Sequence, residues 1–397
     1  MLITNIGELV TNASGLPGDL GLVRGAAVAI TDDAIVWAGS AAEVPRAYRA
    51  AETLDAGGRA VLPGFVDAHT HVVFAGDRSD EFARRLRGES YEQILAAGGG
   101  IHSTVAATRA ASLPALIAGS LPRVQRMLRS GTTTVEVKSG YGLTTESEVR
   151  ILAAAHGVGV ATGITVIPTF LGAHVPDRGT DRSAYVDLVV EEMLPAAVPH
   201  ARFCDVFCDR GAFTVDDARR ILTAAAEHGL GIRIHAEQLT HVGGAELAAE
   251  LGAASADHLD HATAADAAAL AAAGVVAVLL PAASFSMRAP QAPGRMLWDA
   301  GVTVALATDC NPGTSFVESM PFVIALACLE MGLTPEEAVW AATLGGAKSL
   351  RLTDRGRAVP GAAADLVILD APSYLHLPYR PGTDLVWRVV KAGVIVT

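Results

Sequence analysis

Hydrophobic and polar residues follow one repeated pattern through the middle of the chain. Short runs rich in β-branched residues, each ending in polar residues, alternate with alanine-rich stretches of helical spacing. This alternation is typical of βα units that build a parallel sheet, and eight such units favour a closed (β/α)8 barrel. The predicted strands are roughly 61–67, 132–138, 164–171, 203–208, 231–236, 255–259, 275–281 and 303–309. The predicted helices include 144–161, 183–197, 215–229, 241–252, 263–273 and 317–331.

The two ends of the chain lack this alternation. They contain short apolar runs that are interrupted by Gly, Pro and Asp and have no helical spacing, which is typical of antiparallel strands. Each end is too short to hold a core alone. We therefore predict an α/β protein in which a TIM barrel spans residues 61–355 and the terminal segments 1–60 and 356–397 pair into one small β-sandwich domain.

Charge and hydropathy exclude several classes of protein. The formal net charge of −12 and the absence of a basic run argue against nucleic acid or an anionic membrane surface as a partner. The apolar run 267–283 approaches the length of a membrane span, but Gly274 interrupts it and Pro281 ends it. A helix end, a turn and a buried strand explain this run better, so we expect no membrane partner.

The cysteines and the amino terminus indicate a cytoplasmic protein. Four cysteines in 397 residues do not make a disulfide framework, and the first residues lack the charged start and apolar core of a secretory signal. Cys204 and Cys208 lie in a predicted strand, where we expect them to be core thiols. The other two cysteines are Cys310 and Cys328.

Polar residues collect where the predicted strands end, which is where such barrels place their chemistry. His69 and His71 are two residues apart after an apolar strand, so their imidazoles are expected on one side of the backbone, as a metal ion requires of two ligands. Further polar residues end other strands, namely Lys138, His174, His235, His258 and Asp309. So many at one rim are difficult to attribute to chance.

These residues and their order resemble the amidohydrolase superfamily, whose members are metal-dependent hydrolases. Within it, the chain is similar nearly along its whole length to the imidazolonepropionase family. The segments that carry this resemblance are PGFVDAHTHVVFAGDRSDEF, AAGGGI, TTTVEVKSGYGL, FLGAHVP, IHAEQ, GGAELAAELGA, SADHLDH and ATDCNPGTS.

The resemblance implies that His69, His71, His235 and Asp309 bind one Zn²⁺ or Fe³⁺ ion. Imidazole and carboxylate ligands with one position left for water make a catalytic site, in which the pKa of the bound water falls to roughly 7. Relatives with two metals carry a carboxylated lysine on strand four. The predicted strand 203–208 has no lysine, so we expect one metal. We expect Lys138 to pair with Glu136 or a neighbouring loop.

The resemblance also implies a set of substrate contacts. Arg78 would offer its planar guanidinium to a propionate carboxylate. His174 and Gln238 would pair with the polar edge of a ring, and the amide of Gly313 would face a small anion from a tight turn beside Asp309. The full set is Arg78, Tyr141, His174, Gln238, Asn311, Gly313 and Thr314.

The reaction that the resemblance implies is hydrolysis of the cyclic amide of 4-imidazolone-5-propanoate to N-formimidoyl-L-glutamate, in histidine degradation. Asp309 would take a proton from the attacking water and pass it to the leaving ring nitrogen, while His258 would stabilise the oxyanion. We assign no general-base role to Gln238. Glu237, which precedes it, is expected to point to the opposite side of the strand.

Two other functions stay open at this stage. A purine or pyrimidine deaminase of the same superfamily would use much the same metal ligands, although Arg78 and the NPGT turn suit a carboxylate better. A catalytically silent metal-binding scaffold on this fold is the second alternative, although every expected ligand is present. Homodimers are common in the superfamily, and nothing in the sequence excludes one.

Overall fold

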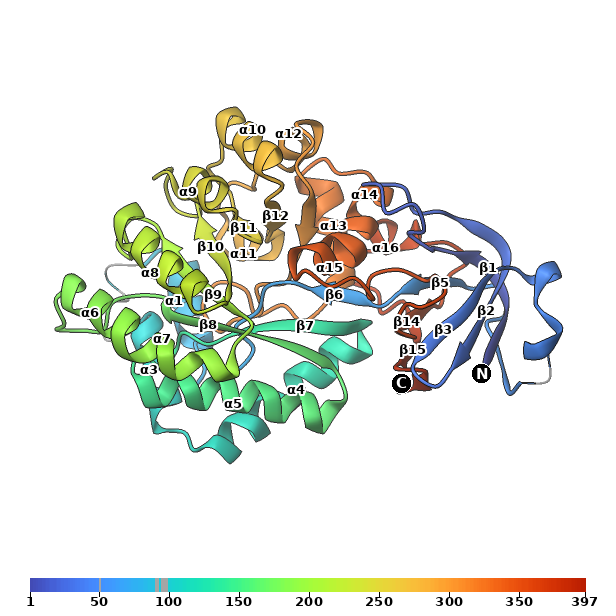
Figure 1. Ribbon diagram of the computed structural model, residues 1–397, viewed down its shortest axis with the longest axis horizontal. Coiled ribbons are helices and arrows are strands. Elements are labelled where there is room, and N and C mark those ends of the chain that lie inside the picture. The colour runs from blue at the N-terminus through green and yellow to red at the C-terminus, as the bar shows by residue number, and fades with distance from the viewer. Residues whose placement is uncertain (50, 90–92, 94–98) are drawn as a thin grey trace.

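The computed structural model describes residues 1–49, 51–89, 93 and 99–397. Its two sheets divide the described chain into a barrel and a second sheet at one end of the molecule (Figure 1). Of the segment 96–101, which contributes to the resemblance, residues 96–98 lie outside the described part.

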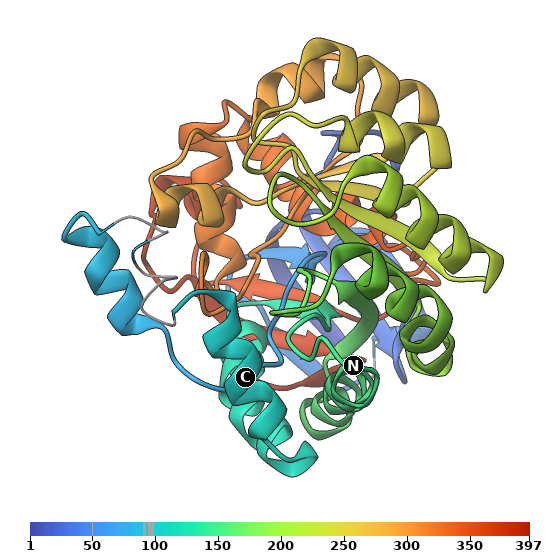
Figure 2. The same cartoon turned by 90° about the vertical axis from the view of Figure 1, so that its left-hand side faces the viewer.

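The barrel contains eight strands that are all parallel to their neighbours, in the order β6 to β13 along the chain. Helices surround these strands when the barrel is seen from its end (Figure 2). The (β/α)8 architecture predicted from the alternating pattern is therefore confirmed. The strands are β6 (Phe65–Asp67), β7 (Thr132–Lys138), β8 (Thr165–Ala173), β9 (Phe203–Cys208), β10 (Gly231–Ala236), β11 (Ser255–His258), β12 (Val276–Leu279) and β13 (Val304–Leu306).

The barrel closes just beyond its first and last strands. Thr70 and Cys310 form an isolated parallel bridge there. The backbone N–H of Asp309 donates to the carbonyl oxygen of His69 over 3.0 Å, and that of His71 donates to Cys310 over 3.0 Å. The segments that follow β6 and β13 are thus held side by side at the carboxyl rim of the barrel.

Threonine side chains start several of the helices that cover the barrel. Thr214 and Thr263 each accept a hydrogen bond from the N–H three residues later, and an aspartate returns the bond, which completes a capping box. The helices between barrel strands are α1 (Ser79–Leu86), α3 (Ile101–Ala110), α4 (Leu113–Arg129), α5 (Thr145–Thr162), α6 (Arg182–Leu188), η3 (Val189–Met193), α7 (Leu194–Ala197), η4 (Val198–His200), α8 (Val215–Glu227), α9 (Gly244–Leu251), α10 (Ala264–Ala273), α11 (Pro281–Met287) and α12 (Gly294–Asp299). After the barrel follow α13 (Met320–Glu330), α14 (Pro335–Trp340), η5 (Ala341–Gly345), α15 (Gly346–Ser349) and α16 (His376–Tyr379).

The second sheet combines strands from both ends of the chain, as predicted. Its path runs β16-β15-β14-β5-β1-β2-β3, with β4 paired to β1. Figure 1 shows the N- and C-terminal strands together at one end of the molecule. The strands are β1 (Leu2–Leu9), β2 (Val23–Thr31), β3 (Ala34–Ser40), β4 (Thr53–Asp55), β5 (Ala60–Pro63), β14 (Leu366–Leu369), β15 (Val386–Lys391) and β16 (Val394–Ile395), and the short helices η1 (Ala41–Glu43) and η2 (Arg46–Tyr48) follow β3.

The first predicted strand, 61–67, is wrong as a single element. It divides at Gly64 into β5, which belongs to the second sheet, and β6, which belongs to the barrel. An added Cβ at Gly64 would stand 2.2 Å from Oγ1 of Thr133, so the backbones approach too closely for a larger residue. The chain therefore passes from one sheet to the other over a single glycine.

Three further expectations have clear outcomes. The run 267–283 divides into the end of α10, a turn at Gly274 and the buried strand β12, as predicted, although Pro281 begins α11 rather than only ending the run. Among the described residues, no helix is both long and apolar enough to cross a membrane. Cys204 and Cys208 are buried free thiols, as expected of core residues.

Candidate metal centre

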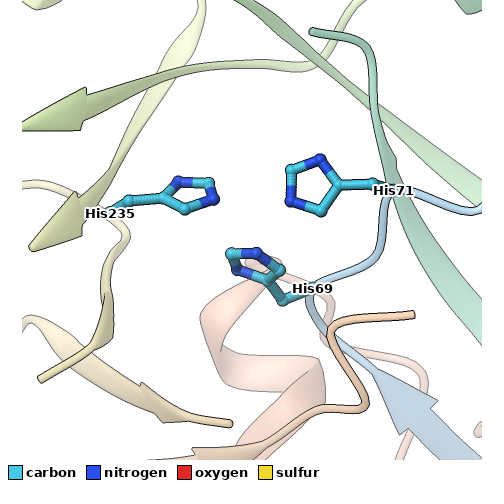
Figure 3. Close-up of side chains that lie close together, drawn as sticks. All are labelled: His69, His71 and His235. Carbon is cyan, nitrogen blue, oxygen red and sulfur yellow. The ribbon is translucent and has the colours of Figure 1, made fainter. Parts of the chain in front are cut away.

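Three histidines converge at the carboxyl rim of the barrel. His69, His71 and His235 are all buried, and each offers a ring nitrogen such that the three nitrogens lie within 4.8 Å of one another. Figure 3 shows the three rings directed toward a common point, His235 from one strand and the other two from the segment that follows β6. The structure thus brings together the three imidazoles that the sequence singled out.

Asp309 joins this group from the segment that follows β13, the last strand of the barrel. Its Oδ1 lies 3.5 Å from Nε2 of His69 and 3.6 Å from Nε2 of His71. Its backbone has a φ of 51°, in the left-handed region that few residues other than glycine adopt. Burial raises the pKa of the Asp309 carboxyl well above its usual range.

The polar atoms at the centre of this group lack partners within the described chain. Nε2 of His69 and of His235 are buried and make no hydrogen bond there. Burial lowers the pKa of His69 and of His71 well below the ordinary value, so both rings are neutral and can offer a lone pair. Unpartnered neutral imidazoles beside a carboxylate are the donor set of a divalent metal, and the residues therefore fit such an ion.

Two aspartates lie behind the histidines. Nδ1 of His69 lies 2.7 Å from Oδ2 of Asp257, a hydrogen bond between two fully buried groups. Nδ1 of His235 lies 3.1 Å from Oδ2 of Asp205, in a less well aligned contact. A carboxylate on one ring nitrogen fixes the tautomer that leaves the other nitrogen free for a metal.

These aspartates belong to a buried cluster of charged side chains inside the barrel. Nζ of Lys138 contacts Glu136 at 2.8 Å, so the predicted pairing of these two residues is confirmed, and it also contacts Asp205 at 2.7 Å and Asp257 at 3.4 Å. Arg233 completes the cluster with a contact of 3.2 Å to Asp257. We call these five residues, Glu136, Lys138, Asp205, Arg233 and Asp257, the ion cluster.

His258 is the last residue of β11 and lies at the edge of the histidine group. Its ring centroid is 5.3 Å from that of His235 and 5.5 Å from that of His69. Its φ of 76° is again left-handed, and its Nδ1 makes no hydrogen bond among the described residues. His258 is thus placed where it could face a ligand beside the metal position.

Tyr141 and His174 form an aromatic wall next to His71. The His174 ring stacks on the His71 ring at a centroid distance of 5.0 Å and lies 5.4 Å from the Tyr141 ring. Burial lowers the pKa of His174 to about 3, so this ring is neutral. The buried carboxylate of Glu148 accepts three backbone N–H bonds of 2.7 Å from the loop that carries Tyr141, and so holds the loop in place.

Arg78 lies at the N-terminal end of α1, at the rim of the site. Its Nε and Nη2 both lie 2.9 Å from Oε2 of Glu81, so its charge is already paired. Its guanidinium rests on the backbone of Gly313, where an added Cβ would stand 2.3 Å from Nη1. Arg85, about two turns further along α1, donates to the Gly313 carbonyl oxygen over 3.3 Å.

Asn311 organises the turn that follows Asp309. Its Oδ1 accepts the N–H groups of Gly313 and Thr314, both over 2.8 Å, and its Nδ2 donates to the Asp309 carbonyl oxygen over 2.7 Å. The amide of Gly313, expected to face an anion, is therefore engaged inside the turn. A ligand at this position would have to compete with Asn311 for it.

Gln238 and Glu237 follow the end of β10. Gln238 is half-buried. The Glu237 carboxylate accepts backbone N–H groups from Val242 and Gly243, over 2.7 and 3.0 Å, which fixes the loop before α9. The Glu237 carboxylate therefore has a structural role in this loop.

Sequence reasoning missed the aspartates and the arginine of the ion cluster. Asp205, Arg233 and Asp257 stand in otherwise apolar strand runs, and each is fully buried. Charged residues inside a buried strand are rare unless they are paired. That rule could have identified them as one group, although it could not have said which histidine each contacts.

The comparisons with known proteins agree with this geometry. Residues 60–396 match the Amidohydrolase family. The chain is 56% identical to an imidazolonepropionase from Streptomyces coelicolor, over 99% of this chain and 98% of the relative. It is 54% identical to an imidazolonepropionase from Mycolicibacterium smegmatis, over 100% of this chain and 97% of the relative.

Solved structures with low sequence identity share the fold. One is an adenosine deaminase from Xanthomonas campestris with bound zinc, with a TM-score of 0.76, 20% identity and coverage of 99% of this chain and 92% of that chain. Another is an atrazine chlorohydrolase from Arthrobacter aurescens complexed with zinc, with a TM-score of 0.72, 19% identity and coverage of 100% and 95%. At such identities the likeness concerns the fold alone.

Proposed function

The chain belongs to the amidohydrolase family and, within it, to the imidazolonepropionases, and on this premise we propose that it hydrolyses the cyclic amide of 4-imidazolone-5-propanoate to N-formimidoyl-L-glutamate. The observation that carries the proposal is the identity of 50–56% with relatives of this name over nearly the whole chain. The geometry supports it, because residues that could bind a metal ion and an arginine that could bind a carboxylate both lie at the carboxyl rim of the barrel.

One divalent or trivalent metal, zinc or iron, fits the group of His69, His71, His235 and Asp309. The fit rests on the unpartnered Nε2 atoms of His69 and His235 and on the nearby carboxylate. When bound, such an ion would lower the pKa of a water molecule and polarise a carbonyl group. We propose a single ion, because Lys138 is held by carboxylates and is not placed as a second ligand.

The proposed reaction adds one water across an amide bond. A C–O bond forms at the ring carbonyl carbon, the ring C–N bond breaks, and the leaving nitrogen takes a proton. Asp309 is suited to carry this proton, since its carboxyl lies at the proposed metal position, with Oδ1 3.5 Å from Nε2 of His69 and 3.6 Å from Nε2 of His71. His258 is neutral, because burial lowers its pKa, and it can donate one N–H to the developing oxyanion.

The remaining rim residues would hold the substrate. Arg78 would bind the propionate carboxylate, sharing its guanidinium between the substrate and Glu81. Tyr141, His174 and Gln238 would surround the ring, and Asn311 with Gly313 and Thr314 would shape the wall beside Asp309. A carboxylate-binding arginine favours an imidazolone with a propionate chain over a neutral nucleobase.

The experiment that tests this proposal is a substrate panel. Purified protein loaded with zinc is assayed with 4-imidazolone-5-propanoate and, in parallel, with purines and pyrimidines. We expect formation of N-formimidoyl-L-glutamate and no release of ammonia from the nucleobases. Ammonia release from a nucleobase without imidazolone turnover would identify a deaminase instead, and metal binding without any turnover would identify a silent scaffold.

The substrate would place the enzyme in histidine degradation. We propose a cytoplasmic site of action, with support from the free state of all four cysteines, three of them buried. A homodimer remains a prediction, to be tested by sedimentation of the purified protein.

A further inference from the structure

The ion cluster connects to both parts of the chain that carry the three histidines, namely the segment after β6 and the strand β10. Asp257 contacts Nδ1 of His69 at 2.7 Å, and Asp205 contacts Nδ1 of His235 at 3.1 Å. The third carboxylate, Glu136, accepts the backbone N–H of Thr70 over 3.3 Å, between His69 and His71. Each carboxylate of the cluster therefore contacts a different part of the histidine group: the His69 ring, the His235 ring, or the backbone between His69 and His71.

One side chain contacts all three of these carboxylates. Nζ of Lys138 lies 2.8 Å from Glu136, 2.7 Å from Asp205 and 3.4 Å from Asp257. An ammonium group has three N–H donors and no acceptor, so three carboxylates use its full capacity. The backbone of Lys138 adds a fourth connection, since its N–H donates to the carbonyl oxygen of Thr70 over 2.9 Å.

Lys138 is an ammonium ion in this setting. Burial works to lower its pKa, but Asp205 and Glu136 outweigh this effect, and the pKa of Lys138 lies above its ordinary value. A protonated amine cannot carry a carboxyl group on its nitrogen. The lysine therefore acts on the site through its contacts and not as a metal-bridging carbamate.

Arg233 has a different place in the cluster. Its Nη2 donates to Asp257 over 3.2 Å and to the carbonyl oxygen of Ala68 over 2.8 Å, and its Nη1 donates to Ser349. Its Nε also lies 3.8 Å from Oε1 of Glu136, so Arg233 supports two carboxylates of the cluster and the backbone before His69. Within the described part of the chain, Lys138 is the one cation that contacts both the carboxylate behind His69 and the carboxylate behind His235.

We propose that Lys138 is a positioning residue that holds His69, His71 and His235 in metal-binding geometry through Asp257, Glu136 and Asp205. The proposal rests on the proposed metal site and adds to it the residue that sets the affinity for the ion. Removing the ammonium would release three carboxylates at once, and the ring orientations would no longer be fixed together. Outer contacts of this kind typically change metal affinity 10- to 100-fold.

Lys391 provides a matched control. It is also a buried lysine, 6% exposed, and its Nζ makes three contacts, to Oδ1 and Oδ2 of Asp365 at 3.0 and 2.8 Å and to Oγ1 of Thr165 at 2.9 Å. It lies at the end of β15 in the second sheet. Lys391→Met removes a comparable buried ammonium without touching a carboxylate behind a histidine.

The test measures zinc affinity by competition with a chromophoric chelator, without substrate. We expect Lys138→Met to bind Zn²⁺ about 10- to 100-fold more weakly than the wild type. Lys391→Met is expected to unfold at a lower temperature but to bind Zn²⁺ as the wild type does. Visible absorption of the Co²⁺-loaded forms should differ between Lys138→Met and the wild type, and agree between Lys391→Met and the wild type.

Several outcomes would overturn the proposal. Equal zinc affinity in Lys138→Met and the wild type would reduce Lys138 to a stabilising core residue. Tighter binding would show that Lys138 acts only as a positive charge that repels the ion. If Lys138→Met does not fold, Glu136→Gln replaces it, because it keeps the shape but weakens one contact of the ammonium; wild-type affinity in that variant would reject the proposal.

The same measurements separate this proposal from the proposed function. A wild type that binds Zn²⁺ but does not hydrolyse the imidazolone would reject the function and leave the role of Lys138 in place. A wild type that hydrolyses the imidazolone while Lys138→Met keeps full affinity would reject only the role of Lys138. A wild type that binds no metal would overturn both.

Discussion

The rim of the barrel contains two regions built in different ways. The histidine group of His69, His71 and His235 is fully buried and rests on strands that the ion cluster joins from behind. The Arg78 corner, consisting of Arg78, Glu81 and the turn 311–314, lies on a helix end and a loop and is only partly buried. We infer from this difference that the metal ligands must be held rigidly, whereas the residues that would bind the side chain of the substrate lie on segments that can adjust.

This contrast leads to different expectations for mutations in the two regions. Changes in the histidine group should abolish metal binding or turnover, because each change removes one of few ligands. Changes in the Arg78 corner should weaken substrate binding while the metal stays in place. Variants in both regions, ordered by the size of the expected effect, can test the division.

The largest effect is expected for His235→Ala. The loss of one of few ligands should leave a folded barrel with strongly reduced metal content and almost no activity. Metal analysis of the purified protein and a turnover assay measure both. His241→Ala is the control, since His241 lies in the loop that follows β10 and its ring pairs with Asp266 at 2.9 Å. Full metal content in His235→Ala would remove this residue from the ligand set.

Asp309→Asn should have the next largest effect. The change keeps the shape but removes a negative charge and the expected proton acceptor, so kcat should fall by about two or more orders of magnitude. Part of the metal should remain, because the three imidazoles are intact. A near-normal kcat in this variant would show that another group carries the proton.

Arg78→Met should reduce kcat/KM about 10- to 150-fold, or roughly 1.5–3 kcal/mol, through lost hydrogen bonds to a charged group. Metal content should not change. The control is Arg84→Met, on the same helix, whose arginine pairs with Glu89 at 2.7 Å. A substrate analogue without the carboxylate sharpens the test: the mutation should add little to its poor turnover, and simple addition of the two losses would place Arg78 elsewhere.

The smallest effect is expected for Gly313→Ala. An added Cβ would meet Nη1 of Arg78 at 2.3 Å, and the guanidinium must move because it is the flexible partner. We expect KM to rise about 3- to 10-fold with kcat and metal content nearly unchanged, since the displacement affects orientation only. Steady-state kinetics decide the matter. A loss of kcat without a change in KM would mean that the turn acts on Asp309 rather than on Arg78.

Much of the fold could be predicted because its signal is local. The alternation of apolar runs and helical spacing lies within each βα unit, and seven of the eight predicted strands match single strands to within a few residues. The exception, 61–67, fails because nothing local says that Gly64 separates two sheets. Helices α3 and α4 were not predicted, and the residues before α3 lie partly outside the described chain.

The candidate site was predictable in part for a similar reason. His69, His71, His235 and Asp309 end strands, and the ends of parallel strands meet at one rim, so their proximity follows from the fold. Contacts between side chains of different strands do not follow from it. The pairing of His69 with Asp257 depends on packing that only the structure reveals. The same is true of Arg78, which is paired with Glu81 rather than free to meet a ligand.

The position of β5 in the second sheet also has a consequence for folding during synthesis. Strand β5 pairs with β1 on one side and with β14 on the other, and it lies immediately before β6 and His69. During synthesis, the β14 side of β5 stays without its partner until Leu366–Leu369 has left the ribosome. A chain that stops short of these residues would expose a strand edge next to the metal centre, and exposed edges invite aggregation. Nonsense mutations that stop the chain between Thr314 and Leu366 should therefore be damaging, although every residue of the proposed active site would still be translated.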